Sequence, residues 1–330
     1  MKTTLIATGL LAMATAAIAQ EKPVLTVYTY DSFVSEWGPG PVVEAAFEAE
    51  CGCDLQFVSA GDGAALLARV RLEGARTNAD VVLGLDTNLT AAAAETGIFA
   101  AHGVLDPALD LPIAWEDDMF LPFDWGYFAF VHDVNLVSNP PKSLKELAES
   151  DLKIVIQDPR SSTPGLGLLL WVKSAYGDDA GMIWDALSDN IVTVTKGWSE
   201  AYGMFLEGES DMVLSYTTSP AYHLIAEDDA SKAAAAFYEG HYMQIEVAGK
   251  VATTDQPALA DQFLAFMLSD GFQGVISTTN WMYPAHVPSA GLPSGFETLI
   301  TPQKSLLFSA QQAADVRDVA LDEWLTTLSQ

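Results

Sequence analysis

The sequence predicts an α/β protein with a mostly parallel sheet covered by helices. Runs of β-branched and aromatic residues, as at 24–30, alternate along the chain with stretches of helical periodicity, as at 41–50. Hydrophobic residues make up 50% of the 330, enough for a large core. No internal repeat, low-complexity tract or flexible linker interrupts this alternation. Helices between successive strands are typical of a parallel sheet.

The first third of the chain contains three of the predicted strands. The first is rich in Val, Thr and Tyr, and the third is a short apolar run of the buried type. Gly52 ends the first helix and Gly61-Asp62-Gly63 forms the turn before the second. The predicted strands are 24–30, 55–59 and 80–85, and the predicted helices are 41–50 and 64–73.

The rest of the chain continues the pattern. Ser143 and Glu146 have the spacing of a capping box that opens a helix. Further helices begin near Leu166, at Trp198 and at Ser219-Pro220. Strands are predicted at 127–131, 153–157, 191–195, 211–215 and 242–251, and longer helices at 256–268 and 310–328.

The charge of the chain excludes some partners. With 15 Lys and Arg against 44 Asp and Glu, the formal net charge is −29. Nucleic acid and anionic lipid both require a basic surface, so neither is expected as a partner. A cationic ligand is compatible with this charge, but so is an acidic surface suited to a salty environment.

The N-terminus has the features of a cleavable signal peptide. Lys2 precedes an apolar run at 5–13 that is too short to span a bilayer, and Ala17-Ile18-Ala19 forms a cleavage site before Gln20. No later stretch is predicted to be a membrane helix, and no lipobox Cys stands at the cleavage point. We therefore expect residues 1–19 to be removed and the protein to be soluble in a bacterial periplasm without a lipid anchor.

The chain has two cysteines, Cys51 and Cys53, separated by Gly52. In an oxidising compartment they could pair, and Gly52 would ease the tight turn. Free thiols are the alternative. A metal site is disfavoured because no His is close in sequence.

Candidate ligand-binding residues follow the strands, because ligands of parallel α/β sheets bind at the carboxyl ends of strands. These loops are rich in aromatic rings, hydroxyls and carboxylates, which suits a flat aromatic cation. The candidates include Tyr30, Trp37, Asp62, Ser162, Trp198, Tyr216 and Trp281.

Each candidate also has a purely structural interpretation. A Trp in an α/β protein is often part of the core, which we expect for Trp171, Trp184 and Trp324 in their helical patterns. Asp62 and Ser162 could be helix N-caps. Alternatively, the hydroxyls and amides of the 161–163 loop could hold an anion such as phosphate.

At these residues the chain closely resembles the periplasmic thiamine-binding proteins of bacteria. The resemblance covers nearly all of the mature chain, weakens after about residue 288 and includes the Cys-x-Cys pair. The matching segments are KPVLTVYTYDSF (22–33), WGPGP (37–41), ADVVLGLD (79–86), QDPRSSTPGLG (157–167), TVTKGWSEAY (193–202), LSYTTSPAYH (214–223) and NWMYP (280–284).

The resemblance implies a two-lobed periplasmic binding protein of type II topology with a ligand cleft between the lobes. Lobe 1 would comprise 20–124 with about 249–285, and lobe 2 would comprise 125–248 with about 286–330. Such a protein captures thiamine, thiamine monophosphate and thiamine diphosphate and delivers them to an inner-membrane ABC permease. We expect a monomer that is not an enzyme and has no metal or cofactor.

The family's ligand positions can be carried over residue by residue. They fall on the seven candidates named above and on Tyr222, which the resemblance alone identifies. Tyr and Trp faces would sandwich the pyrimidine and thiazolium rings, while Asp62 would accept hydrogen bonds or balance charge. Ser162 and nearby amides would hold the phosphate or hydroxyethyl end.

Two other functions remain possible from the sequence. A thiaminase-like enzyme would need a cysteine nucleophile with a base within reach, whereas these two cysteines lie together at a helix end. A different cargo, such as ferric iron or a polyamine, would require converging Tyr oxygens or more carboxylates.

Overall fold

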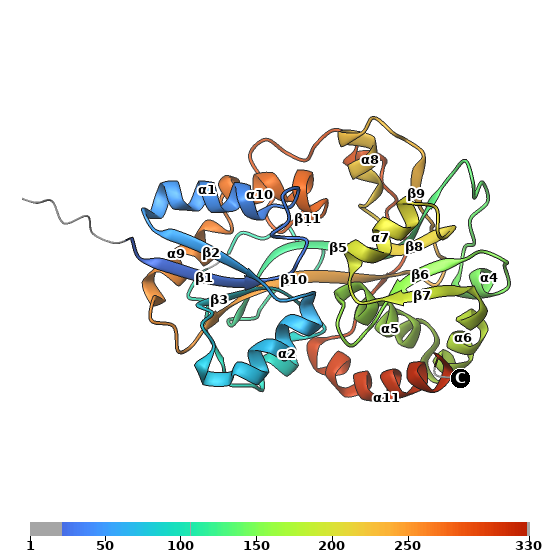
Figure 1. The fold of residues 1–330 in the computed structure, drawn as a ribbon, viewed down its shortest axis with the longest axis horizontal. Coiled ribbons are helices and arrows are strands. Elements are labelled where there is room, and N and C mark those ends of the chain that lie inside the picture. Colours follow the sequence, from blue (N-terminus) through green and yellow to red (C-terminus); the bar gives the residue numbers. More distant parts are fainter. Residues whose placement is uncertain (1–21, 106, 329–330) are drawn as a thin grey trace, which may run out of the picture.

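The computed structural model describes residues 22–105 and 107–328, so the predicted signal peptide lies outside the described residues. One mixed sheet runs through the molecule, with long strands in the order β2-β1-β3-β10-β5-β8-β6-β7 (Figure 1). These strands are β2 Asp54–Ser59, β1 Val24–Thr29, β3 Val81–Asp86, β10 His241–Val251, β5 Phe120–Asp133, β8 Met212–Tyr216, β6 Ile154–Gln157 and β7 Ile191–Thr195. Short strands at the margins are β4 Phe99–Ala100, β9 Lys232–Ala234, β11 Tyr283–Pro284 and β12 Ser305–Leu306.

The prediction of a mostly parallel sheet is wrong at the centre of the molecule. In one half β1 pairs in parallel with β2 and β3, and in the other β6 pairs in parallel with β7 and β8. Between them β10 and β5 run antiparallel to each other, and β10 is antiparallel to β3 while β5 is antiparallel to β8. One of these strands carries the chain into the second half and the other returns it, so they must run in opposite directions.

Helices flank both halves of the sheet. In Figure 1, α1, α9 and α10 lie near β1 and β2, whereas α5, α6 and α7 lie in the half that contains β6 and β7. The C-terminal helix α11 packs against α5 and α6 and reaches α3. The helices are α1 Gly40–Cys51, α2 Gly63–Glu73, α3 Thr90–Ala94, α4 Leu144–Ala148, α5 Thr163–Tyr176, α6 Ala180–Leu187, α7 Trp198–Leu206, α8 Pro220–Ala226, α9 Pro257–Phe266, α10 Asp270–Val275 and α11 Ala310–Leu328.

Local capping explains several of these boundaries. The Ser143 side chain accepts a hydrogen bond from the Glu146 amide at the start of α4. Gly52 ends α1 in the left-handed conformation, with φ of 64°. The helices α3 and α10 were not predicted, whereas α6 contains Trp184, which the sequence placed in a helical pattern. The two unpredicted helices have at most six residues each, too few for helical periodicity to be recognised.

The core has two large clusters of buried side chains. One belongs to the first half and includes Phe47 and Phe263. The other joins residues of both halves and contains Trp171, Trp184 and Trp324, which are 0–4% exposed, so their predicted place in the core is confirmed. The proposed lobes, 20–124 with about 249–285 and 125–248 with about 286–330, remain a prediction.

Cys51 and Cys53 form a disulfide in the structure, with Cα atoms 5.2 Å apart. The bond spans the end of α1 and the residue before β2, and the side chain of Cys53 is buried. Of the three states open at the level of sequence, the structure therefore contains the bonded one.

We expect the double variant Cys51→Ser/Cys53→Ser to lose only roughly 1–2 kcal/mol of unfolding free energy, because chain-entropy stabilisation is small for so short a loop. Urea denaturation measures this loss. Reducing the wild type should give the same loss, and a much larger decrease in the variant would show that the hydroxyls disturb the packing around Cys53.

Candidate ligand-binding site

A cavity of about 540 Å³ opens between the two halves of the sheet. Seven of the eight residues that the sequence proposed line it, and they come from separate elements of the fold. The seven are Tyr30, Trp37, Asp62, Trp198, Tyr216, Tyr222 and Trp281. The structure thus brings together residues that are up to 251 positions apart, although their role in binding stays a proposal.

The positions of these residues at the carboxyl ends of strands explain why most of them converge on one cavity. Tyr30 directly follows β1, Asp62 follows β2, Trp198 follows β7 and Tyr216 is the last residue of β8. Parallel neighbours end at the same edge of a sheet, so their following loops meet there.

Aromatic side chains form the walls of the cavity. The ring of Trp198 stacks on that of Tyr202, with centroids 5.0 Å apart, and donates its Nε1–H to Ser215. Trp37 lies 6.2 Å from Trp198 and is 53% exposed. Trp281 has a left-handed backbone with φ of 55°, a conformation that bulky residues rarely adopt outside constrained sites.

Asp62 joins three helix N-termini at one end of the cavity. Its Oδ2 accepts hydrogen bonds from Ser162 Oγ at 2.7 Å and from the Trp198 amide at 3.1 Å, at the starts of α5 and α7. The Gly63 amide, at the start of α2, donates to Thr163 Oγ1 at 3.0 Å. Burial raises the pKa of Asp62, while these bonds to its carboxylate oppose the shift.

Ser162 is the one proposed residue that does not line the cavity. Its side chain is fully buried and donates to Asp62. Asp62 and Ser162 occupy the N-cap positions of α2 and α5, as the structural interpretation expects, but neither side chain bonds to an amide of its own helix. Thr163 and Pro164, the next residues, do contribute to the lining.

A buried acidic cluster forms another part of the site. Asp124 on β5 and Glu246 on β10 are direct partners in the antiparallel register, and both are buried. Asn280 Nδ2 donates to Asp124 Oδ2 at 2.6 Å and to the Tyr30 hydroxyl at 2.9 Å. Among the described residues that line the cavity there is no lysine or arginine.

Proximity and burial shift the titration of this cluster. Burial raises the pKa of Asp124 to about 8. Burial first and the charge of Asp124 second hold the pKa of Glu246 well above its usual range. The same burial, with these two carboxylates, raises the pKa of Tyr30. The cluster therefore favours a bound proton or a cation.

Sequence reasoning missed Asp124, Gln244 and Glu246, which lie inside long strands rather than at strand ends. Gln244 and Glu246 both line the cavity. The sequence did contain a signal for Gln244 and Glu246. They are polar residues at spacing two within the mostly apolar run 242–251, and side chains at that spacing share one face of a strand.

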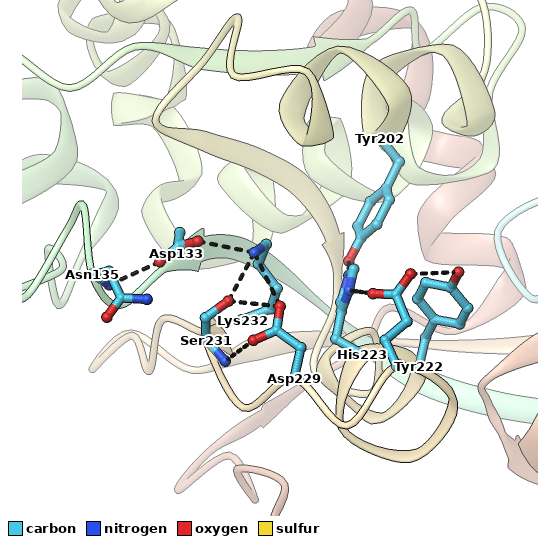
Figure 2. Close-up of polar contacts among 9 residues, drawn as sticks. Asp133, Asn135, Tyr202, Tyr222, His223, Asp229, Ser231 and Lys232 are labelled. Carbon is cyan, nitrogen blue, oxygen red and sulfur yellow. Dashed lines mark hydrogen bonds and ion pairs between the residues drawn. The ribbon is translucent and has the colours of Figure 1, made fainter.

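A chain of hydrogen bonds connects two aromatic residues of the cavity (Figure 2). The Tyr222 hydroxyl donates to Glu227, whose other oxygen lies 2.7 Å from His223 Nδ1. His223 Nε2 in turn lies 2.9 Å from the Tyr202 hydroxyl. These contacts hold both tyrosine rings in place.

The same region contains the one group among the described residues that could approach a metal ion, namely His223, Glu227 and Asp229. Asp229 already accepts hydrogen bonds from Ser231 and lies 3.6 Å from the ammonium of Lys232 (Figure 2). The Glu227 carboxylate is likewise engaged by Tyr222 and His223, so protein donors occupy the ligand atoms of this group in the structure.

Comparisons with known proteins agree on one family. The profile of the bacterial extracellular solute-binding proteins matches residues 35–274. A thiamine-binding periplasmic protein of Salmonella typhimurium is 57% identical over 96% of both chains, and one of Escherichia coli is 57% identical over 94% of both. The solved structure of a periplasmic thiamin-binding protein superposes with a TM-score of 0.91, at 54% identity, covering 98% of this chain and 100% of the other.

The acidic cluster makes the stability of the ligand-free protein depend on pH. An unfolded aspartate titrates at about 3.9, so with a folded pKa of about 8 the protonated Asp124 stabilises the fold at low pH. That contribution is lost as the pH rises between these two values. We expect a higher free energy of unfolding at about pH 5 than at about pH 8, and a smaller difference in Asp124→Asn.

The control is Asp133→Asn. A hydrogen bond from Lys232 lowers the pKa of Asp133, so its contribution is lost only in more acidic solution. In this variant, denaturant titration should give the same difference in free energy of unfolding between about pH 5 and about pH 8 as in the wild type. Equal differences in Asp124→Asn and the wild type would contradict the role of Asp124.

Proposed function

Because this chain belongs to the thiamine-binding periplasmic proteins, a family within the bacterial extracellular solute-binding proteins, we propose that it binds thiamine in the cavity between its two halves. It is a periplasmic solute-binding protein, a class that carries a solute without converting it. The observation that carries the ligand assignment is the convergence of aromatic rings and buried carboxylates on one cavity without a basic side chain among its described lining residues.

The chemistry of the walls suits the rings of thiamine. Trp37, Trp198 and Trp281 offer flat apolar faces to the pyrimidine and thiazolium rings, and the positive thiazolium gains cation–π attraction of roughly 0.5–2 kcal/mol per face. Tyr30, Tyr216 and Tyr222 complete the proposed binding set with rings whose hydroxyls add polar contacts.

The helix N-termini around Asp62 suit the other end of the ligand, and this part of the proposal covers thiamine monophosphate and diphosphate. The starts of α2, α5 and α7 present amides and positive dipole ends to one place, which favours a phosphate or a hydroxyl. Asp62 would accept a hydrogen bond from a ligand hydroxyl at this end, and Ser162, which donates to Asp62, would hold that carboxylate in place.

Transport follows from a ligand that contacts both halves. Such a ligand stabilises the closed arrangement only, and it shifts the open–closed equilibrium by its difference in affinity for the two states. The closed monomer would then deliver thiamine to an inner-membrane ABC permease that recognises the closed surface.

The most direct test identifies the small molecule released when freshly purified protein is denatured. A compound that forms thiochrome on oxidation supports the proposal, whereas iron or spermidine would refute it.

A thiaminase-like activity is the rival on this fold, but Cys51 and Cys53 are joined in a disulfide and neither lines the cavity. Incubation with thiamine and an aniline should yield no thiazole product.

We expect Trp198→Ala to weaken thiamine binding by about 2–4 kcal/mol, because the change removes a stacked indole from the wall. The matched control is Trp184→Ala, since Trp184 is 2% exposed and lies outside the cavity lining. That variant should lower stability more than affinity per folded molecule. Calorimetry on both decides, and unchanged affinity in Trp198→Ala would remove this residue from the site.

Asp62→Ala should weaken thiamine binding roughly 10- to 100-fold, because it removes the acceptor for Ser162 and for the Trp198 amide. Asp62→Asn keeps an acceptor oxygen and should retain most of the affinity. Small-angle scattering with saturating thiamine should show a more open average shape for the Ala variant. If both variants bind like the wild type, Asp62 does not link the halves in the complex.

A further inference from the structure

We propose that Gln244 and Glu246 are the residues that recognise the aminopyrimidine ring of thiamine and so determine specificity at this site. The inference rests on the proposed function and deepens it. Neither residue is among the eight candidates of the sequence analysis, and neither lies at a strand end.

The two side chains share one face of β10. Residues at spacing two along a strand project to the same side, and both of these line the cavity. Gln244 is opposite Gly126 and Glu246 is opposite Asp124 on β5, so both occupy the central antiparallel pair between the halves. The backbone of Glu246 is held on two sides, since Glu246 also pairs with Asp86 on β3, while Gln244 two residues earlier is held by β5. The pair is therefore positioned rigidly.

Three polar atoms of these two side chains have no hydrogen-bond partner within the described part of the chain. Gln244 is 0% exposed, and neither its Nε2 nor its Oε1 has a hydrogen-bond partner there. Glu246 is 6% exposed, and its Oε2 is likewise unpaired. Unpaired buried polar atoms are costly to a fold and are rare in native proteins. Because these atoms belong to residues of the cavity wall, we infer that a bound ligand supplies their missing hydrogen-bond partners.

The aminopyrimidine presents a matching edge. Its ring nitrogen accepts a hydrogen bond and the adjacent amino group donates one, which is the pattern that a Gln amide pairs with on adenine. A carboxyl oxygen of Glu246 can accept from the same amino group in either protonation state. The thiazolium ring has no such edge and presents mainly charge, which the aromatic faces accommodate. The amide and the carboxyl therefore suit the pyrimidine end.

The decisive variant is Gln244→Met, which keeps the volume and removes both polar atoms. Because no protein hydrogen bond is lost, the ligand-free variant should be as stable as the wild type or more stable, with a Tm higher by roughly 1–3 °C. Its affinity for thiamine should fall at least roughly tenfold by calorimetry. A residue with a purely structural role would instead lower the Tm and leave affinity unchanged, and that outcome would overturn the proposal.

Gln157→Met is the matched control. Gln157 is also buried, but its Nε2 donates to the Leu214 carbonyl at 3.0 Å, and it lies outside the cavity lining. This variant should lose stability and keep its thiamine affinity. The pair of variants thus separates an amide that serves the fold from one that serves the ligand.

Ligand analogues test which ring is recognised. The wild type should bind thiamine at least tenfold more tightly than an analogue with hydrogen in place of the amino group, and this preference should nearly vanish in Gln244→Met and shrink in Glu246→Gln. An undiminished preference in both variants would overturn the proposal. The proposal would also be overturned if these variants instead lost the preference for thiamine over an analogue in which a neutral thiophene ring replaces the thiazolium. Failure of the wild type to bind thiamine at all would refute the proposed function itself.

Discussion

The antiparallel pairing of β5 with β10 supports every other part of the molecule. These two strands are the longest in the sheet, and each pairs with the other and with strands of one half. Residues of both strands, including Asp124 and Glu246, stand side by side at the level of the cavity. The connection between the halves and part of the candidate site are therefore one piece of backbone, and movement of the halves must leave this pair intact.

The site concentrates interactions that do not favour the fold. Two carboxyls, Asp124 and Glu246, stand directly opposite each other, and ionising both of them in this arrangement is destabilising. Buried atoms of Asp124, Gln244 and Glu246 lack hydrogen-bond partners among the described residues. The buried Phe and Leu side chains of the two clusters offset this loss elsewhere. The apolar clusters away from the cavity thus stabilise the fold, whereas the polar residues within the cavity are available for ligand recognition.

Much of this arrangement could be predicted from sequence, and the exceptions share physical causes. Period-two and helical patterns place Tyr30, Asp62 and Trp198 after strands, and strand ends meet because parallel neighbours share direction. Strand direction leaves no mark on periodicity, so the antiparallel centre and the residues inside its strands stay hidden. Tyr222 lies within the short helix α8, where no pattern marks it, and only the family resemblance identifies it.

The order of strands also has a consequence for when the protein can fold. The centre of the sheet joins Asp86 on β3 to Glu246 on β10, so it cannot form until most of the chain has emerged from the ribosome. Pairings between such distant segments slow folding, because a long loop must be closed, at a cost in chain entropy, before the stabilising contacts can form. A protein destined for the periplasm gains from this delay, because a chain that is still unfolded can be threaded through the inner membrane.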